Sequence, residues 1–483
     1  MRTGPRTRKT RGSAPRPSIS AGSRALPEKT QGSGQRPAAV FDVTTALTLI
    51  VSLLVLVALG VHIAIALGMT SAVGIYLVTG DIEVVASMLG STAYEALRDY
   101  VFAVIPLFML MGEFIGKSGA VTDVYRGLNR GLKRLPGRLA IATVLGNALF
   151  SFVTGVSIAS AAAFSRIAYP EMSRYGYHKG FALGTVAGSS CLGMLIPPSV
   201  LMIVWGILTE KSIGQIFLAG VLPGLLLTIM FVAYILITAL LRPALVGGGV
   251  DSQVQESSGD EVSLSAFLIS MAGILAVIVA VLGGIWFGVF TPTEGAGAGA
   301  FIGLVLGVVK GMRYRGIIDS ILSVGRTSAP ILLLLVAASL YSRTLAMTGM
   351  TNAIQDLFLG TGLTPFLIIV VMVVVWFLLG MVIDSISIML LTVPIFAPIA
   401  EQLGYDPIAF AIIGILAIEA GLLTPPFGLL VYTVKSAVQD EDPSVSIVQI
   451  FKSSFPYWCI ILFAATLIIN FPKIATFLPS LLF

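Results

Sequence analysis

Apolar runs long enough to cross a lipid bilayer recur along this chain. A helix needs about 20 apolar residues to span a hydrocarbon core of about 30 Å. Stretches of this length, or nearly so, occur at 44–67, 217–240, 264–289, 365–382 and 455–470. Only 11% of the 483 residues are charged, against about 25% in soluble domains. The sequence therefore predicts an all-α, multi-pass membrane protein.

The spacing of reactive side chains argues against several other functions. Cys191 and Cys459 lie far apart, and His62 and His178 are equally isolated, so neither a disulfide framework nor a transition-metal spacing is present. The phosphate-binding pattern GxxxxGK[ST] does not occur. We therefore expect no resident cofactor, no ATP binding by the chain itself and no nucleic-acid partner.

The first 42 residues differ in composition from the rest. Residues 1–40 carry nine Lys and Arg against one Glu, and are rich in Gly, Pro and Ser. This composition is typical of a disordered basic tail. A dispensable linker is the simplest interpretation, and contact with anionic lipid or a mis-assigned start are the alternatives. No cleavage signal follows a short apolar core, so we do not predict a removable signal peptide.

Two short motifs relate one half of the chain to the other. GMLIPPS begins at Gly193, and GLLTPPF begins at Gly421, 228 residues later. The same offset, without a gap, pairs Pro170 with Pro398, Gly176-Tyr177 with Gly404-Tyr405, and Ser157-Ile158 with Ser385-Ile386. A constant register over more than 40 residues indicates an internal repeat.

Each half contains a double apolar stretch followed by a helix that a proline pair interrupts. Adjacent prolines remove two backbone donors and clash with the preceding turn, so they break a helix. We predict re-entrant helical hairpins at 138–172 and 363–400, and broken helices at 181–208 and 407–437. The predicted organisation is a tail (1–42), a first inverted repeat (43–241), a polar linker (242–263) and a second inverted repeat (264–475).

The remaining predicted segments complete both halves. In the first half they are spans at 44–67, 70–90, 101–116 and 216–241 and an amphipathic piece at 120–135. In the second half they are spans at 264–289, 294–310, 328–345 and 455–473 and a short polar piece near 350–360. Five crossings and one hairpin in each half require the second half to be inverted relative to the first, as in many secondary transporters.

Loop charge supports this topology. With the first span starting outside, the predicted cytoplasmic loops are 117–138, 166–179, 242–263, 310–326 and 435–452, and they hold 16 Lys and Arg. Only four lie on the other side once the tail is set aside. Positive residues gather on the cytoplasmic side. The basic tail would lie outside, but most of its charges are too far from a span for this rule to count them.

The hairpin tips and helix breaks are the candidate ion- and substrate-binding positions. Non-helical backbone inside a membrane is tolerated where it lines a cavity, and its released oxygens suit an alkali cation. The first set is Thr154, Gly155, Ser157, Ser160, Gly193, Pro197, Pro198 and Ser199. The second set is Asp384, Ser385, Ser387, Gly421, Thr424, Pro425 and Pro426. Proline kinks with capping hydroxyls are the structural alternative.

Three acidic residues have more than one interpretation. Asp384 either binds a coupling ion, because a membrane carboxylate is costly unless it has a function, or caps the helix that starts at Ser385. Glu419 either holds the second break or binds a cation, and we favour the structural role. Glu294 is expected to cap the following span. An intramembrane enzyme using Asp384 would need a second matching carboxylate or a metal pair, and the sequence has neither.

Five stretches resemble one known family, the large permease (DctM-like) subunits of tripartite ATP-independent periplasmic (TRAP) transporters. They are IPLFMLMGEFIGKSG (105–119), GSSCLGMLIPPSVLMIVWGILTEKSIGQIFLAGVLPGLLL (188–227), FTPTEGAGAGA (290–300), LGMVIDS (379–385) and GLLTPPFGLLVY (421–432). The resemblance covers about 44–475 and departs at two places. Many members have Ser-Gly-Ser where this chain has TGV at 154–156, with Asp at the position of Ser160, and Asn at the position of Ala417.

The resemblance implies an inverted-repeat, elevator-type importer in the bacterial inner membrane, driven by Na⁺ or, less often, H⁺. Its cargo would be a small organic acid such as a dicarboxylate. Its implied partners are a small four-span membrane subunit, a periplasmic substrate-binding protein and the lipid bilayer. A stand-alone divalent-anion/Na⁺ symporter of elevator type, which needs no binding protein, is the alternative within transport.

Overall fold

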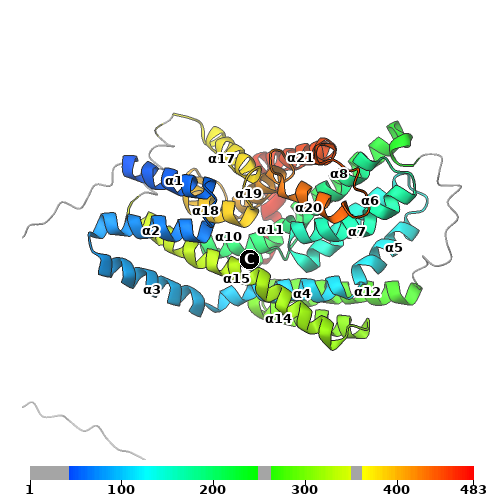
Figure 1. Cartoon of the computed structure of the whole chain (residues 1–483), viewed down its shortest axis with the longest axis horizontal. Coiled ribbons are helices and arrows are strands. Elements are labelled where there is room, and N and C mark those ends of the chain that lie inside the picture. The colour runs from blue at the N-terminus through cyan, green and yellow to red at the C-terminus, as the bar shows by residue number, and fades with distance from the viewer. Residues whose placement is uncertain (1–42, 248–262, 350–359, 361) are drawn as a thin grey trace, which may run out of the picture. The chain divides into compact units, whose positions relative to one another are not determined.

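The described part of the chain consists of helices joined by turns (Figure 1). The computed structural model describes residues 43–247, 263–349, 360 and 362–483. The predicted tail at 1–42, most of the linker at 242–263 and the polar piece near 350–360 lie outside these ranges. Within them, eight helices are long and apolar enough to cross a membrane. These helices confirm the predicted all-α polytopic fold.

The first half begins with five helices that precede the first hairpin. They are α1 (Val43–Ala58), α2 (Ile63–Thr79), α3 (Ile82–Arg98), α4 (Val104–Lys117) and α5 (Ala120–Gly131), with the 3-10 turn η1 (Tyr100–Ala103) before α4. The prediction of two spans at 44–67 and 70–90 is wrong, because three helices begin in this range. Gly60 and Gly80 adopt positive φ angles of 83° and 66°, which end helices where a run of apolar residues continues.

The first hairpin and the first broken helix follow. The helices are α6 (Arg138–Thr154), α7 (Ser157–Arg174), α8 (Lys179–Ser190), α9 (Leu192–Leu195), α10 (Val200–Thr209) and α11 (Ile213–Leu241). Only Gly155 and Val156 separate α6 from α7. The segment predicted as a broken helix at 181–208 thus contains α8, the single turn α9 and α10, and its last interruption precedes Val200.

The second half contains the corresponding helices. They are α12 (Leu264–Ile278), which continues through a π-helical turn (Val279–Gly283) into α13 (Gly284–Trp286), then α14 (Pro292–Val309), α15 (Tyr314–Met347), α17 (Pro365–Gly380), α18 (Ser385–Gln402), α19 (Pro407–Gly421), α20 (Leu429–Val438), α21 (Ile447–Asn470) and α22 (Lys473–Leu482). Helix α15 begins well before the span predicted at 328–345. The sequence analysis did not predict α22, which extends beyond residue 475.

Helix boundaries repeat with the offset found in the sequence. Helices α7 and α18 both have 18 residues, and their first residues, Ser157 and Ser385, are 228 positions apart. Helices α8 and α19 begin at Lys179 and Pro407, again 228 positions apart. The register therefore extends from side-chain identity to the start and end of the helices around the breaks.

The two halves are packed into one another. Helix α8 lies against α21, where the Tyr457 hydroxyl is 2.8 Å from that of Thr185. A Cβ atom at Gly188 would fall 2.1 Å from the Tyr457 ring, so the contact requires glycine. Trp205 of α10 stacks edge-on against Trp376 of α17, with ring centroids 5.9 Å apart. The first break is thus buried partly by helices of the second half.

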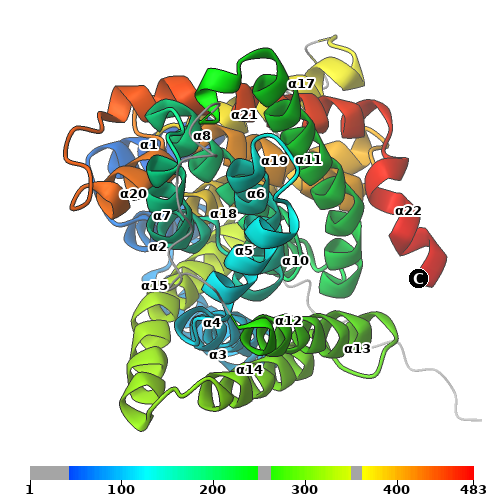
Figure 2. The ribbon, with the colours of Figure 1, turned by 90° about the vertical axis from the view of Figure 1, so that its right-hand side faces the viewer.

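A second group of helices lies to one side of the hairpins. Figures 1 and 2 place α3, α4, α12 and α14 together along one edge of the ribbon, and α4 packs closely on α14. Gly299 of α14 permits this approach, because a Cβ atom there would fall 2.4 Å from the sulfur of Met111. This group is separate from the helices that carry the tips and breaks.

Candidate functional site

The first hairpin tip is fixed to the first break by the backbone. Gly155 ends α6 with a φ of 60°, and a Cβ atom on it would lie 2.4 Å from the Pro198 carbonyl oxygen. The amide of Val200 donates to the Gly155 carbonyl oxygen at 3.1 Å. Only glycine combines this left-handed conformation with so close an approach. The structure therefore brings the predicted tip and the predicted break together.

The first break is buried along its whole length, from Cys191 to Ser199. Ser199 caps α10 by accepting from the Met202 amide at 3.5 Å, and its hydroxyl donates to the Met194 carbonyl oxygen at 2.5 Å. A Cβ atom at Gly193 would lie 3.0 Å from the Ser160 hydroxyl oxygen and from the Ser157 backbone. The break therefore lies directly against the first turn of α7.

The first set differs in how its hydroxyls are satisfied. Thr154 donates to the Phe150 carbonyl oxygen within α6 at 3.1 Å, which is an ordinary intrahelical bond. Ser157 and Ser160 are fully buried, and their hydroxyls have no hydrogen-bond partner among the described residues. Buried polar groups without partners are rare in native proteins. These two hydroxyls are consequently the members of the set available to a ligand.

The second tip is organised around Asp384. Its carboxylate accepts from the Ser387 amide at 3.0 Å and from the Ser387 hydroxyl, so it caps α18 as one of its two predicted roles requires. Ser385 opens the helix and is buried. A carboxylate has further lone pairs beyond those used in a cap. Its ion-binding role stays a prediction.

The second break contacts its hairpin through a pair of glycines. A Cβ atom at Gly421 would lie 2.5 Å from the Phe377 carbonyl oxygen and 2.7 Å from Gly380. Thr424 donates to the Gly421 carbonyl oxygen at 2.6 Å. The Phe427 amide donates to the Met381 carbonyl oxygen at 3.0 Å. The second set therefore also converges, although its tip meets the break on the side of α17 rather than α18.

Two grooves lie beside the second tip. One has a volume of about 680 Å³ and lies between this tip and the α1–α2 turn, with His62, Asp384, Ser387 and Phe427 in its wall. The other, of about 450 Å³, is lined by Asp384, Phe427 and Tyr432 among others. Both volumes are in the range of small-molecule sites. Sequence reasoning missed His62, because its turn was placed inside a span.

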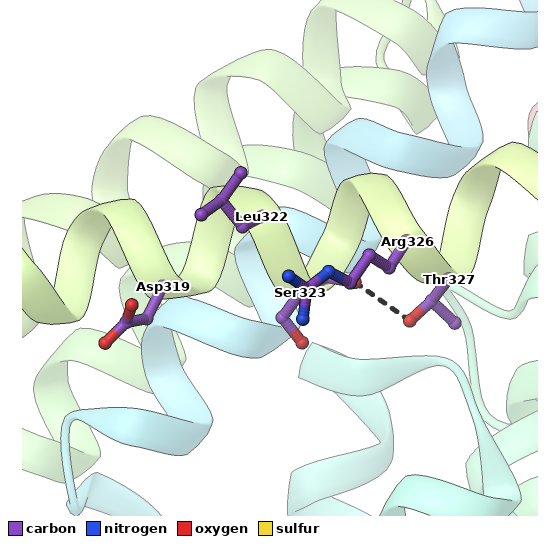
Figure 3. Close-up of a pocket in the computed structure, with 5 residues that line it drawn as sticks. All are labelled: Asp319, Leu322, Ser323, Arg326 and Thr327. Carbon is purple, nitrogen blue, oxygen red and sulfur yellow. Dashed lines mark hydrogen bonds between the residues drawn. The ribbon is translucent and has the colours of Figure 1, made fainter.

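A further pocket of about 440 Å³ lies on the surface of α15 (Figure 3). It is lined by Asp319, Leu322, Ser323, Arg326 and Thr327. All five belong to one helix, and the Thr327 hydroxyl donates to the Ser323 carbonyl oxygen at 2.9 Å. None of them belongs to the predicted sets, so this pocket is separate from the candidate site.

The donor types around the tips suit an alkali cation. Across the described ranges, no group of three His, Cys, Asp or Glu side chains is placed to hold a metal ion. Hydroxyls, carbonyl oxygens and single carboxylates are hard donors. Glu294, in contrast, forms the expected capping box with Thr291. Glu419 lies buried beside Ser157 rather than near Asp384, a position that no local sequence signal could predict.

A polar network joins the first hairpin to the loop that follows α20. The carboxylate of Asp442 accepts from Lys179 at 2.6 Å, from Ser444 at 2.5 Å and from Tyr169 at 2.8 Å. The hydrogen bond from Lys179, followed by those from Ser444 and Tyr169, holds the pKa of Asp442 well below its usual range. The network fixes α7 and α8 to a segment of the second half.

Solved structures with a similar fold are membrane transporters. The YdaH transporter of Alcanivorax borkumensis matches with a TM-score of 0.61 and 14% identity, over 82% of this chain and 89% of that one. MtrF of Neisseria gonorrhoeae, described as an antimetabolite efflux pump, matches with a TM-score of 0.58 and 14% identity, over 88% and 94%. At this identity the likeness concerns the fold alone.

Sequence relatives are more specific. A C4-dicarboxylate TRAP transporter large permease protein of Pseudomonas aeruginosa is 33% identical over 421 residues, which cover 86% of this chain and 93% of that protein. An ectoine TRAP large permease of Halomonas elongata is 27% identical, over 90% and 99%. A sialic acid TRAP large permease of Vibrio cholerae is 27% identical, over 80% and 87%. All three are transporter subunits rather than enzymes.

The family assignment rests on nearly the whole helical body. Residues 50–474 match the family described as tripartite ATP-independent periplasmic transporter, DctM component. The matched range contains both hairpins and both breaks, and the predicted location in the bacterial inner membrane is confirmed with it. The chain therefore belongs to the DctM family and is the large permease subunit of a TRAP transporter.

Proposed function

We propose that this permease imports a small organic acid by coupling it to a Na⁺ gradient, with cations held at the two tip-and-break sites. The observation that carries the proposal is that each hairpin tip lies against a helix break, at Gly155 and Val200 in one half and at Met381 and Phe427 in the other. Interrupted helices of this kind present backbone oxygens and half-helix ends to ions and anionic substrates.

The grooves beside the second tip support a substrate position there. Asp384 and Phe427 line both grooves, so a cation at the tip would lie next to a bound carboxylate and attract it. Phe427 is 58% exposed and offers an apolar surface to the carbon skeleton. The relatives named for dicarboxylate, ectoine and sialic acid indicate small polar organic cargo, and a dicarboxylate is our first candidate.

The helix grouping supports an elevator motion. The hairpins and breaks form one packed group, and α3, α4, α12 and α14 form another beside it. Sliding of one rigid group against the other would carry the site across the membrane without rearranging it. Membership of the family further supports two partners, a small membrane subunit and a periplasmic binding protein.

Substitution of Asp384 by Asn tests the cation site. Asn caps a helix as well as Asp does, so Asp384→Asn removes the charge while α18 keeps its cap. We expect Na⁺-dependent uptake into proteoliposomes containing both partners to fall about tenfold or more, because an ion ligand is lost. Ser385→Ala should weaken it less.

The matched control is Asp406→Asn. Asp406 caps α19 by accepting from the Ile408 and Ala409 amides, but it belongs to neither candidate set. Its replacement should leave Na⁺ dependence unchanged. Equal Na⁺ dependence in the wild type and in Asp384→Asn would contradict the assignment. Full uptake without the binding protein would favour the stand-alone symporter instead.

A further inference from the structure

Three buried polar side chains near the first break have no hydrogen-bond partner among the described residues. They are Ser157 and Ser160 on α7 and Glu419 on α19. The two serines are 0% exposed and Glu419 is 1% exposed. Both carboxylate oxygens of Glu419 are unpaired. The three side chains come from both halves of the chain, so their proximity is a product of the fold.

Their arrangement defines one buried space. Ser157 and Ser160 are three residues apart and lie on the same face of α7. Gly193 lets the break approach both, because it has no side chain to separate them. The Ser157 hydroxyl is the side chain that interacts with the Glu419 carboxylate, and Cys191 in the break is also within its electrostatic range. Two hydroxyls and one carboxylate therefore converge beside the break.

An unpaired carboxylate at this depth needs a positive partner. Burial of an isolated charge is very costly, so buried charges are paired or bind ions. No Lys, Arg or His in the described part of the chain forms an ion pair with Glu419. One carboxylate carries one negative charge, so a monovalent cation gives a neutral site, whereas a divalent ion would leave a net charge in a low dielectric. Hydroxyl and carboxylate oxygens are suitable ligands for Na⁺.

The internal repeat gives independent support. The offset of 228 places Glu419 on Cys191 and Asp384 on Val156. The first half therefore has no carboxylate at either position, and the second half has both. Glu419 contacts the first tip and Asp384 forms the second. Each tip consequently has one carboxylate, although both carboxylates belong to the same repeat.

We infer that Glu419 is a direct ligand of a Na⁺ ion held with Ser157 and Ser160, so that the second repeat supplies the charge of the first cation site. This inference rests on the proposed Na⁺ coupling and adds to it a residue from the other half. It also makes the two repeats dependent on each other, since the first site is incomplete without α19.

The test is the Na⁺ dependence of thermal unfolding of the full chain in lipid nanodiscs. Na⁺ is titrated against choline at constant ionic strength. Glu419→Gln keeps the shape and removes the charge, and we expect the Na⁺ concentration for half-maximal stabilisation to rise at least about tenfold. Ser157→Ala should raise it less. Ser165→Ala is the matched control, because Ser165 is a third buried, unpaired hydroxyl on α7, and it should leave the value unchanged.

The outcomes separate this inference from the function on which it rests. An unchanged Na⁺ response in Glu419→Gln would overturn the inference alone, since the carboxyl would then be protonated and structural. An equal loss in Ser165→Ala would also overturn it. Absence of any Na⁺ response in the wild type would overturn Na⁺ coupling itself. If Glu419→Gln does not fold, Glu419→Asp keeps the charge and should change the preference for Li⁺ over Na⁺, and an unchanged preference would count against ligation.

Discussion

The two tip-and-break regions have the same helix boundaries but opposite exposure. In the first, Pro197, Pro198 and Ser199 are all buried. In the second, Pro425, Pro426 and Phe427 at the same register are exposed, and two grooves open beside them. The duplicated backbone therefore supports two environments. The first is suited to a dehydrated ion, and the second is open to a larger molecule.

Side chains account for this difference better than the backbone does. Ser199 is a small capping residue that turns inward to the Met194 carbonyl oxygen, and Phe427 at the same register is large and 58% exposed. Val382, at the second tip, is 59% exposed. A polar cap permits burial, and a bulky apolar residue beside a groove is typical of a binding surface. The comparison can be tested at individual positions.

The largest effect is expected at Gly155. Gly155→Ala would place a Cβ atom 2.4 Å from the Pro198 carbonyl oxygen at a φ of 60°. Backbone strain alone costs roughly 1–3 kcal/mol, and the clash adds to it. We expect a clear loss of thermal stability and of uptake.

Gly297→Ala is the control for that experiment, because a Cβ atom at Gly297 meets no other atom within 4 Å. It should be neutral or slightly stabilising in the helix. If Gly155→Ala were as stable as the control, the first tip would not be fixed to its break as described.

An intermediate effect should separate Ser199 from Phe427, which share a register position. Ser199→Ala removes a helix cap and leaves the Met194 carbonyl oxygen unpaired, which should lower stability by about 0.5–2 kcal/mol. Phe427→Ala is at an exposed position, so its effect on stability should stay within about 0.5 kcal/mol. It should instead raise the KM for uptake, because Phe427 lines both grooves. Thermal unfolding and uptake kinetics of both variants measure this, and the reverse pattern would break the comparison.

The smallest effect concerns the link between the halves at Asp442. Its pKa is lowered in the folded state, so its stabilising contribution is present above the unfolded pKa of about 3.9 and is lost as the pH falls below that value. Asp442→Asn should therefore lower the melting temperature slightly at pH 7 and leave it unchanged near pH 3. Unfolding of both proteins across this pH range measures the difference. A constant difference at all pH values would show that packing, not charge, is involved.

The repeat and the proline pairs made the breaks predictable from the sequence. Adjacent prolines interrupt helices for local steric reasons, and the offset fixed equivalent positions in both halves. The hydroxyls and glycines at the tips followed from the same register. Asp384 had a recognisable capping context before Ser385, and the structure contains that cap.

Other features depend on local caps or on distant contacts. The region of α1 to α3 was misjudged because Gly60 and Gly80 end helices inside one apolar run, and hydropathy does not register a change of backbone conformation. Glu419 and Ser157 are far apart in sequence, and only packing of α19 beside the first break brings them together. A single sequence carries no local signal for such a contact.

The matching lengths of α7 and α18 restrict how this chain can be engineered. One residue inserted between a tip and its break would rotate everything after it by about 100° around the helix axis. Gly193 would then no longer face Ser157, and a side chain would occupy the close contact. Tags, reporters or fusion points therefore belong outside 157–198 and 385–426, where the spacing in residues is itself part of the binding geometry.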